Sequence, residues 1–258
     1  PVLQRADIVA VQEVGVSQDG TNTLARLAAD LKGGRGWTYR TVMSYPGKEY
    51  GNGFLFRSTV RPVTEQVVPL PRLDRLGWVA RLKTEGGKPD TKSAFAQIFE
   101  IGRRRLRVIS VHLDFAGGTT HRVRQLRHLL GALNQVDEAD GHAVDILCGD
   151  FNTCGFYRSK VAKTETRQLL DVALTRGFTD CSASVPWTSD LFSSIDTADP
   201  ARRLLRFGQM LGLRYRQKLD HLLVRGAHTV APAAAVVIPG WEHLPGSDHL
   251  PVVLELVV

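Results

Sequence analysis

The sequence predicts an α/β protein in which two stacked sheets, mixed or antiparallel, carry helices on their outer faces. Three observations support this prediction. Strand-like runs are the most numerous elements. The closely spaced runs between Thr38 and Leu113 leave little room for the helical crossovers that a purely parallel sheet needs. Several amphipathic segments must each bury an apolar stripe, and the outer face of a sheet offers the surface for it.

The predicted strands are short runs in which apolar residues are continuous or alternate with polar ones. In chain order they cover residues 8–12, 38–43, 53–57, 60–68, 79–83, 94–101, 106–113, 145–148, 219–224, 234–238 and 252–257. Gly, Pro and charged residues gather at 85–92, where a hairpin loop between two of these strands accounts for them.

Three segments have the spacing of amphipathic helices. The first covers residues 24–31, and the polar residues 21–23 before it can supply the N-cap. The second runs from about residue 120 to 136 and has four leucines on one face. The third contains the apolar residues of 169–173.

Residues 182–217 form the least regular stretch, where prolines and aspartates precede a segment with five arginines. We interpret the stretch as a surface excursion between core strands. Such a loop is often where substrate preference resides, and a disordered connector is the alternative interpretation.

The composition is that of an ordinary globular protein, with 258 residues, 43% of them hydrophobic and 23% charged. No linker-like segment interrupts it, so we expect a single domain over residues 1–258 and a monomer. The net charge of +7 favours an anionic substrate or a polyanionic partner such as nucleic acid. A solvated hairpin end is the better explanation of the cluster at Arg103, Arg104 and Arg105.

The three cysteines and the apolar runs bear on where the protein acts. The cysteines have irregular spacing, which fits neither a disulfide framework nor a zinc site and slightly favours a reducing, cytoplasmic compartment. No apolar run approaches the ~18 residues that a transmembrane helix needs, so we expect no transmembrane segment. Localisation is otherwise unreadable from the sequence.

Four short motifs place acidic, amide or imidazole side chains where a predicted strand ends or begins. Glu13 follows the first strand, and His112 ends the strand before Asp114. A solvated charge explains Glu13 taken alone, and a hydrogen-bonded core residue explains His112 taken alone. The third motif, Gly-Asp-Phe-Asn with Asp150 and Asn152, is more specific, because such a string arises by chance in roughly one chain of this size in six hundred.

The fourth motif is Gly-Ser-Asp-His-Leu-Pro, which contains Asp248 and His249 and precedes the last predicted strand. A histidine here suits a site where the imidazole contacts substrate and a carboxylate elsewhere fixes its tautomer. Asp220, in the strand-like run Leu-Asp-His-Leu-Leu-Val, is a candidate for that carboxylate. Taken singly, each of these residues is more often a surface charge.

Taken together, Gln-Glu, Ser-Val-His-Leu, Gly-Asp-Phe-Asn, Leu-Asp-His and Ser-Asp-His, in this order, resemble the endonuclease/exonuclease/phosphatase superfamily. That family includes deoxyribonuclease-like enzymes, apurinic-site endonucleases, sphingomyelinases and inositol polyphosphate phosphatases. The resemblance extends from Asp7 to Val257, and Asn52 in Tyr-Gly-Asn-Gly and Arg122 with Gln125 add supporting matches. It implies a four-layer αββα sandwich and a metal-dependent hydrolase of phosphate esters.

The resemblance also implies a metal site. Glu13, Asp150, Asn152 and Asp248 would hold Mg²⁺, with Mn²⁺ as a possible substitute. The sequence lacks a Cys/His cluster, which argues against zinc.

The catalytic roles follow from the same resemblance. Asp150 would orient or deprotonate the attacking water, and Asn152 would hydrogen-bond the phosphoryl oxygens. His249 would contact the scissile phosphate while Asp220 orients its ring. His112 would be a second imidazole donor to the phosphate or the leaving oxygen. Asn52 and Arg122 would support the site, and which group is the formal base stays open.

One departure from the family concerns the first strand, which ends in an Asn that helps to hold metal and phosphate. Pro1 lies too close to the first predicted strand for that element to fit, so we expect a domain truncated at its N-terminus. Three hypotheses follow for function. A nuclease or other phosphodiesterase comes first, a lipid or small-molecule phosphoesterase second, and an inactive binding module or fragment third.

Overall fold

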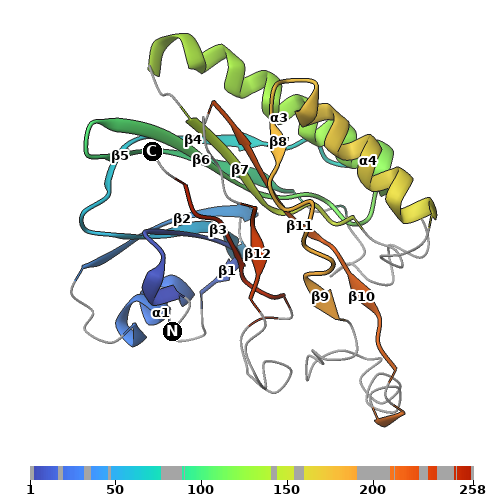
Figure 1. Cartoon of the computed structure of the whole chain (residues 1–258), viewed down its shortest axis with the longest axis horizontal. Helices are drawn as coiled ribbons and strands as arrows, with labels where there is room; N and C mark the ends of the chain where they lie inside the picture. Colours follow the sequence, from blue (N-terminus) through green and yellow to red (C-terminus); the bar gives the residue numbers. More distant parts are fainter. Residues whose placement is uncertain are drawn as a thin grey trace.

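The computed structural model of the chain describes residues 3–16, 20–31, 36–45, 48–76, 89, 91–140, 144–153, 160–190, 210–211, 213–226, 232–236, 247 and 249–256. A short 3₁₀ turn, Leu3–Arg5, precedes the first strand. Within these residues the elements form four layers, with one helix on the outside of a small sheet and two helices on the outside of a large one (Figure 1). The predicted αββα sandwich is therefore confirmed.

The small sheet contains β1 (Ile8–Gly15), β2 (Trp37–Tyr45) and β3 (Lys48–Arg57) in the order β1-β3-β2, all antiparallel. Helix α1 (Thr23–Asp30) covers its outer face through Leu24, which packs with Val14 and Leu55. The side chain of Asn22 accepts a hydrogen bond from the backbone N–H of Leu24, which is the N-cap expected of residues 21–23.

The large sheet is mixed and has the order β4-β5-β6-β7-β11-β8. Its strands are β4 (Arg61–Pro69), β5 (Ser93–Ile101), β6 (Arg104–His112), β7 (Val144–Asp150), β8 (Thr179–Asp180) and β11 (Asp220–Arg225). Strands β6 and β7 run parallel because helix α3 (Gly118–Asp140) returns the chain between them. Helices α3 and α4 (Lys160–Leu174) bury their leucine stripes on the outer face.

The two sheets meet through an apolar core rich in phenylalanine. Phe54 of β3 packs on Phe95 and Phe99 of β5 with ring centroids 5.1 and 5.7 Å apart, and Phe56 lies 5.2 Å from Phe99. Polar bonds also cross the gap, among them one from Asn52 Nδ2 to the carbonyl oxygen of Ser93 at 2.8 Å. This bond fixes the lateral position of one sheet on the other.

Two small antiparallel pairs complete the described part of the chain. Strands β9 (Ser189–Asp190) and β10 (Arg216–Gln217) pair with each other, as do β12 (Ala234–Ala235) and β13 (Val252–Val253). The first pair lies in the stretch predicted to be irregular, so that prediction missed a short region of pairing.

Most predicted elements lie near an observed one. Helix α3 extends beyond the predicted 120–136 at both ends, and the last two predicted strands are shorter than expected. The predicted strand at 79–83 and most of the hairpin at 85–92 lie outside the described residues. None of the described helices combines the length and apolarity needed to cross a bilayer.

Candidate active site

Three polar residues form a row across adjacent strands at one end of the large sheet. Asp150, the last residue of β7, lies opposite His112 at the end of β6 and opposite Asp220 at the start of β11. Residues opposite each other on neighbouring strands point to the same face, so the three side chains converge. His112 Nε2 is 3.7 Å from Asp150 Oδ2.

The Gly-Asp-Phe-Asn string forms a tight turn at the end of β7. Asp150 Oδ1 accepts a hydrogen bond from the Asn152 N–H at 2.7 Å, and Asn152 Nδ2 donates to the carbonyl oxygen of Leu113 at 2.8 Å. The backbone of Asn152 is left-handed, with φ 50°, a conformation that Asn tolerates better than most residues. The turn therefore holds the Asp150 carboxylate and the Asn152 amide next to each other.

The ring of His249 contacts a carboxylate at the start of β11. Its Nδ1 lies 2.7 Å from Asp220 Oδ2. The backbone of His249 bridges to Ser189, and the hydroxyl of Thr188 accepts hydrogen bonds from the backbone N–H groups of Leu219 and Asp220 at 3.0 and 3.1 Å. Asp220 thus takes the Nδ1 side of the ring.

Glu13 approaches this row from the small sheet. A bulge in β1 between Val11 and Val14 places Glu13 in a left-handed conformation with φ 58°, and its Oε1 lies 3.8 Å from His112 Nδ1. The neighbouring Gln12 donates to the hydroxyl of Ser110 on β6 at 2.9 Å. The small sheet thus contributes an exposed carboxylate to a cluster otherwise built on the large sheet.

Lys92 was not among the residues predicted from the sequence. This lysine is buried just before β5, and its Nζ donates to the carbonyl oxygen of Leu113 at 3.2 Å, the same oxygen that Asn152 uses. Its positive charge acts on both His112 and Asp150. Its one sequence signal was a lysine directly before an apolar strand, which is ordinarily a surface residue.

The electrostatics of the cluster follow from burial. Burial raises the pKa of Asp150 to about 7, the Asp220 carboxylate raises it as well, and His249, the Asn152 N–H and Lys92 act in the opposite direction. Burial lowers the pKa of His112 well below its usual value, with contributions from Lys92 and His249. At neutral pH His112 is therefore uncharged, and its approach to Asp150 is a polar contact between a neutral ring and a carboxyl group.

Two predicted supporting residues lie beside the cluster, in hydrogen bonds with backbone. Asn52 is buried and bonds Ser93, the residue after Lys92. Arg122, buried on α3, donates to the carbonyl oxygen of Phe115 in the loop after β6. Both bonds fix backbone next to the site. Asp248 lies outside the described residues.

The donor atoms present fit a hard divalent cation. Among the described residues, no three His, Cys, Asp or Glu side chains form a ready-made metal cage. Magnesium does not need one, because it keeps several waters and takes only one or two carboxylates. Burial and the neighbouring Asp220 carboxylate raise the pKa of Asp150, so a cation bound there would favour the ionised carboxylate. The side chains of Glu13, Asp150 and Asn152 carry oxygen atoms of the kind that such a cation binds.

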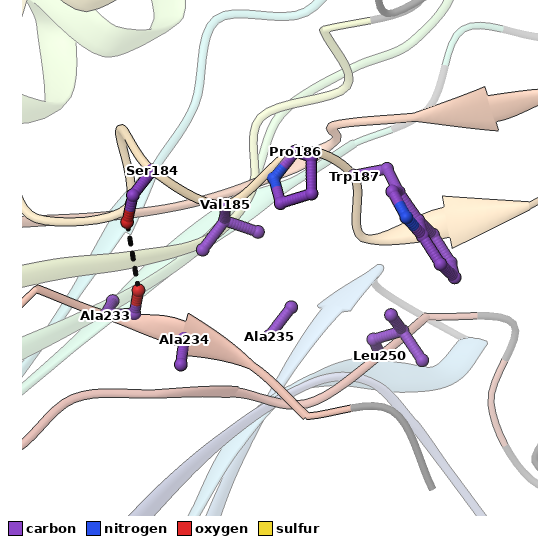
Figure 2. Close-up of a pocket in the computed structure, with 8 residues that line it drawn as sticks. All are labelled: Ser184, Val185, Pro186, Trp187, Ala233, Ala234, Ala235 and Leu250. Atoms are coloured by element: carbon purple, nitrogen blue, oxygen red, sulfur yellow. Dashed lines mark hydrogen bonds between the residues drawn. The ribbon is translucent and has the colours of Figure 1, made fainter. Parts of the chain in front are cut away.

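A pocket of about 240 Å³ lies next to Leu250, the residue after His249 (Figure 2). Its wall is largely apolar and includes Val185, Pro186, Trp187 and Leu250. Leu250 follows His249, and its N–H donates to the carbonyl oxygen of Thr188 at 2.7 Å. The guanidinium of Arg216 also lies over the Trp187 ring, with Cζ 4.4 Å from the ring centroid.

Comparisons with known proteins identify a family and related folds. A family model described as the endonuclease/exonuclease/phosphatase family matches residues 2–249. A search of curated proteins found no match.

Among solved structures, a Bacteroides thetaiotaomicron mannosyl-6-phosphatase is 16% identical with a TM-score of 0.63, over 100% of this chain and 87% of that one. D. rerio TDP2, complexed with a single-strand DNA product, is 16% identical with a TM-score of 0.59, over 97% and 86%. The human Nocturnin catalytic domain, with a bound sulfate anion, is 19% identical with a TM-score of 0.56, over 99% and 83%. At these identities the likeness concerns the fold.

Proposed function

The chain belongs to the endonuclease/exonuclease/phosphatase family, and from this premise we propose that it is a magnesium-dependent hydrolase of phosphodiesters. One observation carries the proposal: Asp220, whose carboxylate contacts His249 Nδ1, lies opposite Asp150 on the neighbouring strand. An oriented imidazole and a carboxylate held this close can supply the proton transfers that accompany water attack on a phosphate.

Each residue has a distinct part in the reaction. Asp150 accepts the proton of the attacking water, because its carboxylate lies opposite Asp220, which contacts His249. His249 donates from Nε2 to a phosphoryl oxygen, and Asp220 stabilises the ring in its protonated form. The second N–H of the Asn152 amide and the neutral ring of His112 bind the remaining phosphate or leaving oxygens.

The metal belongs to the proposal as well. Held by Glu13, Asp150, Asn152 and Asp248, Mg²⁺ or Mn²⁺ would supply neutralisation of the charge on the phosphoryl oxygens. The buried positive charge of Lys92 would likewise stabilise the negative charge on the phosphoryl oxygens.

Substitution of the central pair tests the proposal. Asp150→Ala and His249→Ala are each expected to lower kcat/KM for bis(p-nitrophenyl) phosphate by about a thousandfold, because each removes a group that acts on the transition state. Asp171→Ala and His128→Ala are matched controls, since both residues are exposed on the outer helices, and they should keep wild-type turnover. Turnover retained in either site variant, at equal folding by circular dichroism, removes the mechanism.

Removal of metal gives an independent test. A chelator should abolish turnover and added Mg²⁺ should restore it, while calorimetry should detect saturable Mg²⁺ binding that Glu13→Gln weakens. A chain that shows neither turnover nor saturable binding would favour the alternative of another class, an inactive binding module or fragment.

A substrate panel separates the enzyme classes. Plasmid DNA, RNA, sphingomyelin and inositol phosphates, each with Mg²⁺ and with chelator, distinguish a nuclease from a lipid or small-molecule phosphoesterase. The net charge of +7 and the DNA product bound to TDP2 support nucleic acid as the first candidate.

A further inference from the structure

His221 is a buried histidine of β11 that the proposed reaction does not use. It is 1% exposed and directly follows Asp220. Neighbouring residues of a strand point to opposite faces of the sheet, so His221 points away from Asp220. Leu223, on the face of His221, packs in the core that includes leucines of α3 and α4, whereas Leu222 packs between the two sheets. Strand β11 thus presents Asp220 to the candidate active site and His221 to the helix-covered face.

On that face the His221 ring contacts the turn formed by the Gly-Asp-Phe-Asn string. Its Nε2 lies 3.2 Å from Oγ1 of Thr153, the residue after Asn152, and both side chains are buried. The ring of Phe151 lies edge to face with the imidazole, with centroids 5.3 Å apart. The N–H of Phe151 also donates to the carbonyl oxygen of Leu219 at 2.9 Å. Strand β11 and the residue before it therefore contact the turn on both sides of Asn152.

The direction of the bond between His221 and Thr153 follows from the hydroxyl proton. Thr153 Oγ1 donates that proton to the carbonyl oxygen of Lys218, so it can only accept from His221. Nε2 therefore carries the ring proton. Nδ1 keeps its lone pair, and this atom is buried without a hydrogen-bond partner in the part of the chain that the structure describes. Burial lowers the pKa of His221 well below its usual value, and Lys218 lowers it further, so the ring carries one proton at neutral pH.

The opposite tautomer would be unfavourable at both nitrogens. The lone pair of Nε2 would face the lone pairs of the Thr153 oxygen, and Nδ1 would place a proton where the described residues offer no acceptor. The contacts therefore select a single form of the ring, in which one buried N–H donates to the turn.

We propose that His221 is a positioning residue of the candidate active site: as the Nε2–H tautomer it donates to Thr153 and so fixes the turn that places Asp150 and Asn152. It acts through Thr153 and touches neither substrate nor metal. Asn152 needs such support, because its left-handed backbone is a conformation that persists only where the surroundings hold it. The effect on catalysis rests on the proposed hydrolase function, whereas the tautomer and the hold on the turn rest on the contacts alone.

Nuclear magnetic resonance of protein with ¹⁵N-labelled histidine tests the tautomer. The ring signals that vanish in His221→Gln belong to His221. At neutral pH they should show a protonated Nε2 and an Nδ1 with a lone pair, and Thr153→Val, which removes the acceptor, should shift the Nε2 signal. A proton on Nδ1 in wild type would overturn the proposal.

Two substitutions of His221 form a matched pair for the hold on the turn. The Gln amide reaches the place of Nε2 and can donate to Thr153, whereas the shorter Asn amide reaches only the place of Nδ1. The Asn152 N–H, which donates to Asp150, should exchange with deuterium about tenfold faster in His221→Asn and as in wild type in His221→Gln. Val172→Ala, which truncates a buried side chain of α4 in the same helix-side core, is the control and should leave this exchange unchanged.

Kinetics provide the catalytic readout. His221→Asn should lower kcat for bis(p-nitrophenyl) phosphate by about tenfold with little change in KM, because the misplaced groups act on the transition state. His221→Gln should restore kcat to near the wild-type value. Val172→Ala should keep the wild-type kcat, since lower stability alone does not move the turn.

Three further results would overturn the positioning role. They are a His221→Asn variant with wild-type exchange and kcat, equal losses in His221→Asn and His221→Gln, and a Val172→Ala variant that loses as much as His221→Asn. If wild type does not hydrolyse bis(p-nitrophenyl) phosphate, the proposed function is rejected. Faster exchange at Asn152 in His221→Asn alone would still support the hold of His221 on the turn.

Discussion

Several residues at the site adopt backbone conformations that few side chains tolerate. Glu13 and Asn152 have positive φ values of 58° and 50°, and Gly149 has φ 133°. A left-handed non-glycine residue costs about 1–2 kcal/mol, so packing elsewhere must hold Glu13 in place. At Gly149 the constraint is also steric, because an added Cβ would lie 2.0 Å from the carbonyl oxygen of Val111.

Gly149→Ala is therefore expected to destabilise the protein by about 2–4 kcal/mol, through backbone strain and the clash between β7 and β6. Urea denaturation measures the change. Gly131→Ala is the control: Gly131 lies in helix α3 with nothing within 4 Å of the added Cβ, and alanine there should stabilise by up to about 1 kcal/mol. Equal free energies of unfolding for Gly149→Ala and wild type would show that β6 and β7 can move apart to admit the methyl group at no cost.

Strands β6, β7 and β11 are joined by a buried ion cluster as well as by their ladder. Asp145 of β7 accepts from Arg107 Nε on β6 at 2.8 Å and from Arg225 Nε on β11 at 2.9 Å. Arg107 and Asp145 are almost fully buried, and Arg225 also stacks on Phe178, 4.9 Å from the ring centroid. The cluster thus holds the three strands whose other ends carry His112, Asp150 and Asp220.

Asp145→Ala should cost about 3–5 kcal/mol, because it leaves the buried guanidinium of Arg107 without its carboxylate. The free energy of unfolding from denaturant titration measures this effect. Asp7→Ala, which removes a carboxylate that is 70% exposed and 3.8 Å from Arg57, should change the stability little. Similar free energies of unfolding for the two variants would show that the ion cluster contributes little to stability.

Much of this architecture could be predicted from the sequence, and the failures have physical causes. Continuous apolar runs and leucine stripes predicted the central strands and the outer helices, because burial dictates those patterns. The two-residue strands β8 to β10 carry no period, since two residues cannot show one.

At the site, too, residues within sequence motifs could be predicted, whereas a residue positioned by long-range contacts could not. Asp150, Asn152 and Asp220 were predicted to act together with His249. In the structure Asp220 contacts His249 and lies opposite Asp150, and the N–H of Asn152 donates to Asp150. Lys92 escaped notice because its burial depends on Leu113, which lies far along the chain. Non-local hydrogen bonds of this kind leave no local pattern.

The response of the whole molecule to acid depends on its buried histidines. His221 is fully buried and lies 3.2 Å from the hydroxyl of Thr153; burial lowers its pKa well below the usual value, and Lys218 lowers it further. The unfolded chain takes up a proton at this residue near pH 6.5, whereas the folded protein does not. The unfolding free energy due to His221 therefore falls as pH drops below about 6.5.

His221→Gln should reduce this acid sensitivity. Between pH 7 and pH 5, wild type should lose up to about 2 kcal/mol more stability than the variant, measured by urea titration at each pH. Asp150, whose pKa is raised, makes the folded protein more stable as pH falls. Wild type and variant both contain Asp150, so its contribution cancels when the two are compared at equal pH. His128→Gln, at an exposed position, should match wild type at both pH values. A His221→Gln variant as acid-sensitive as wild type would place the effect elsewhere.

The hydrogen bond from Gln12 to Ser110 and the register between Asp150 and Asp220 join segments far apart along the chain. Such distant pairings form late, after the loops between them have closed. A half-folded intermediate that has docked only the helices on the large sheet would hold Asp150 without Glu13 or His249. Recovery of phosphodiester hydrolysis during refolding should thus lag behind the recovery of helical signal. The return of activity would then report the final assembly of the sandwich.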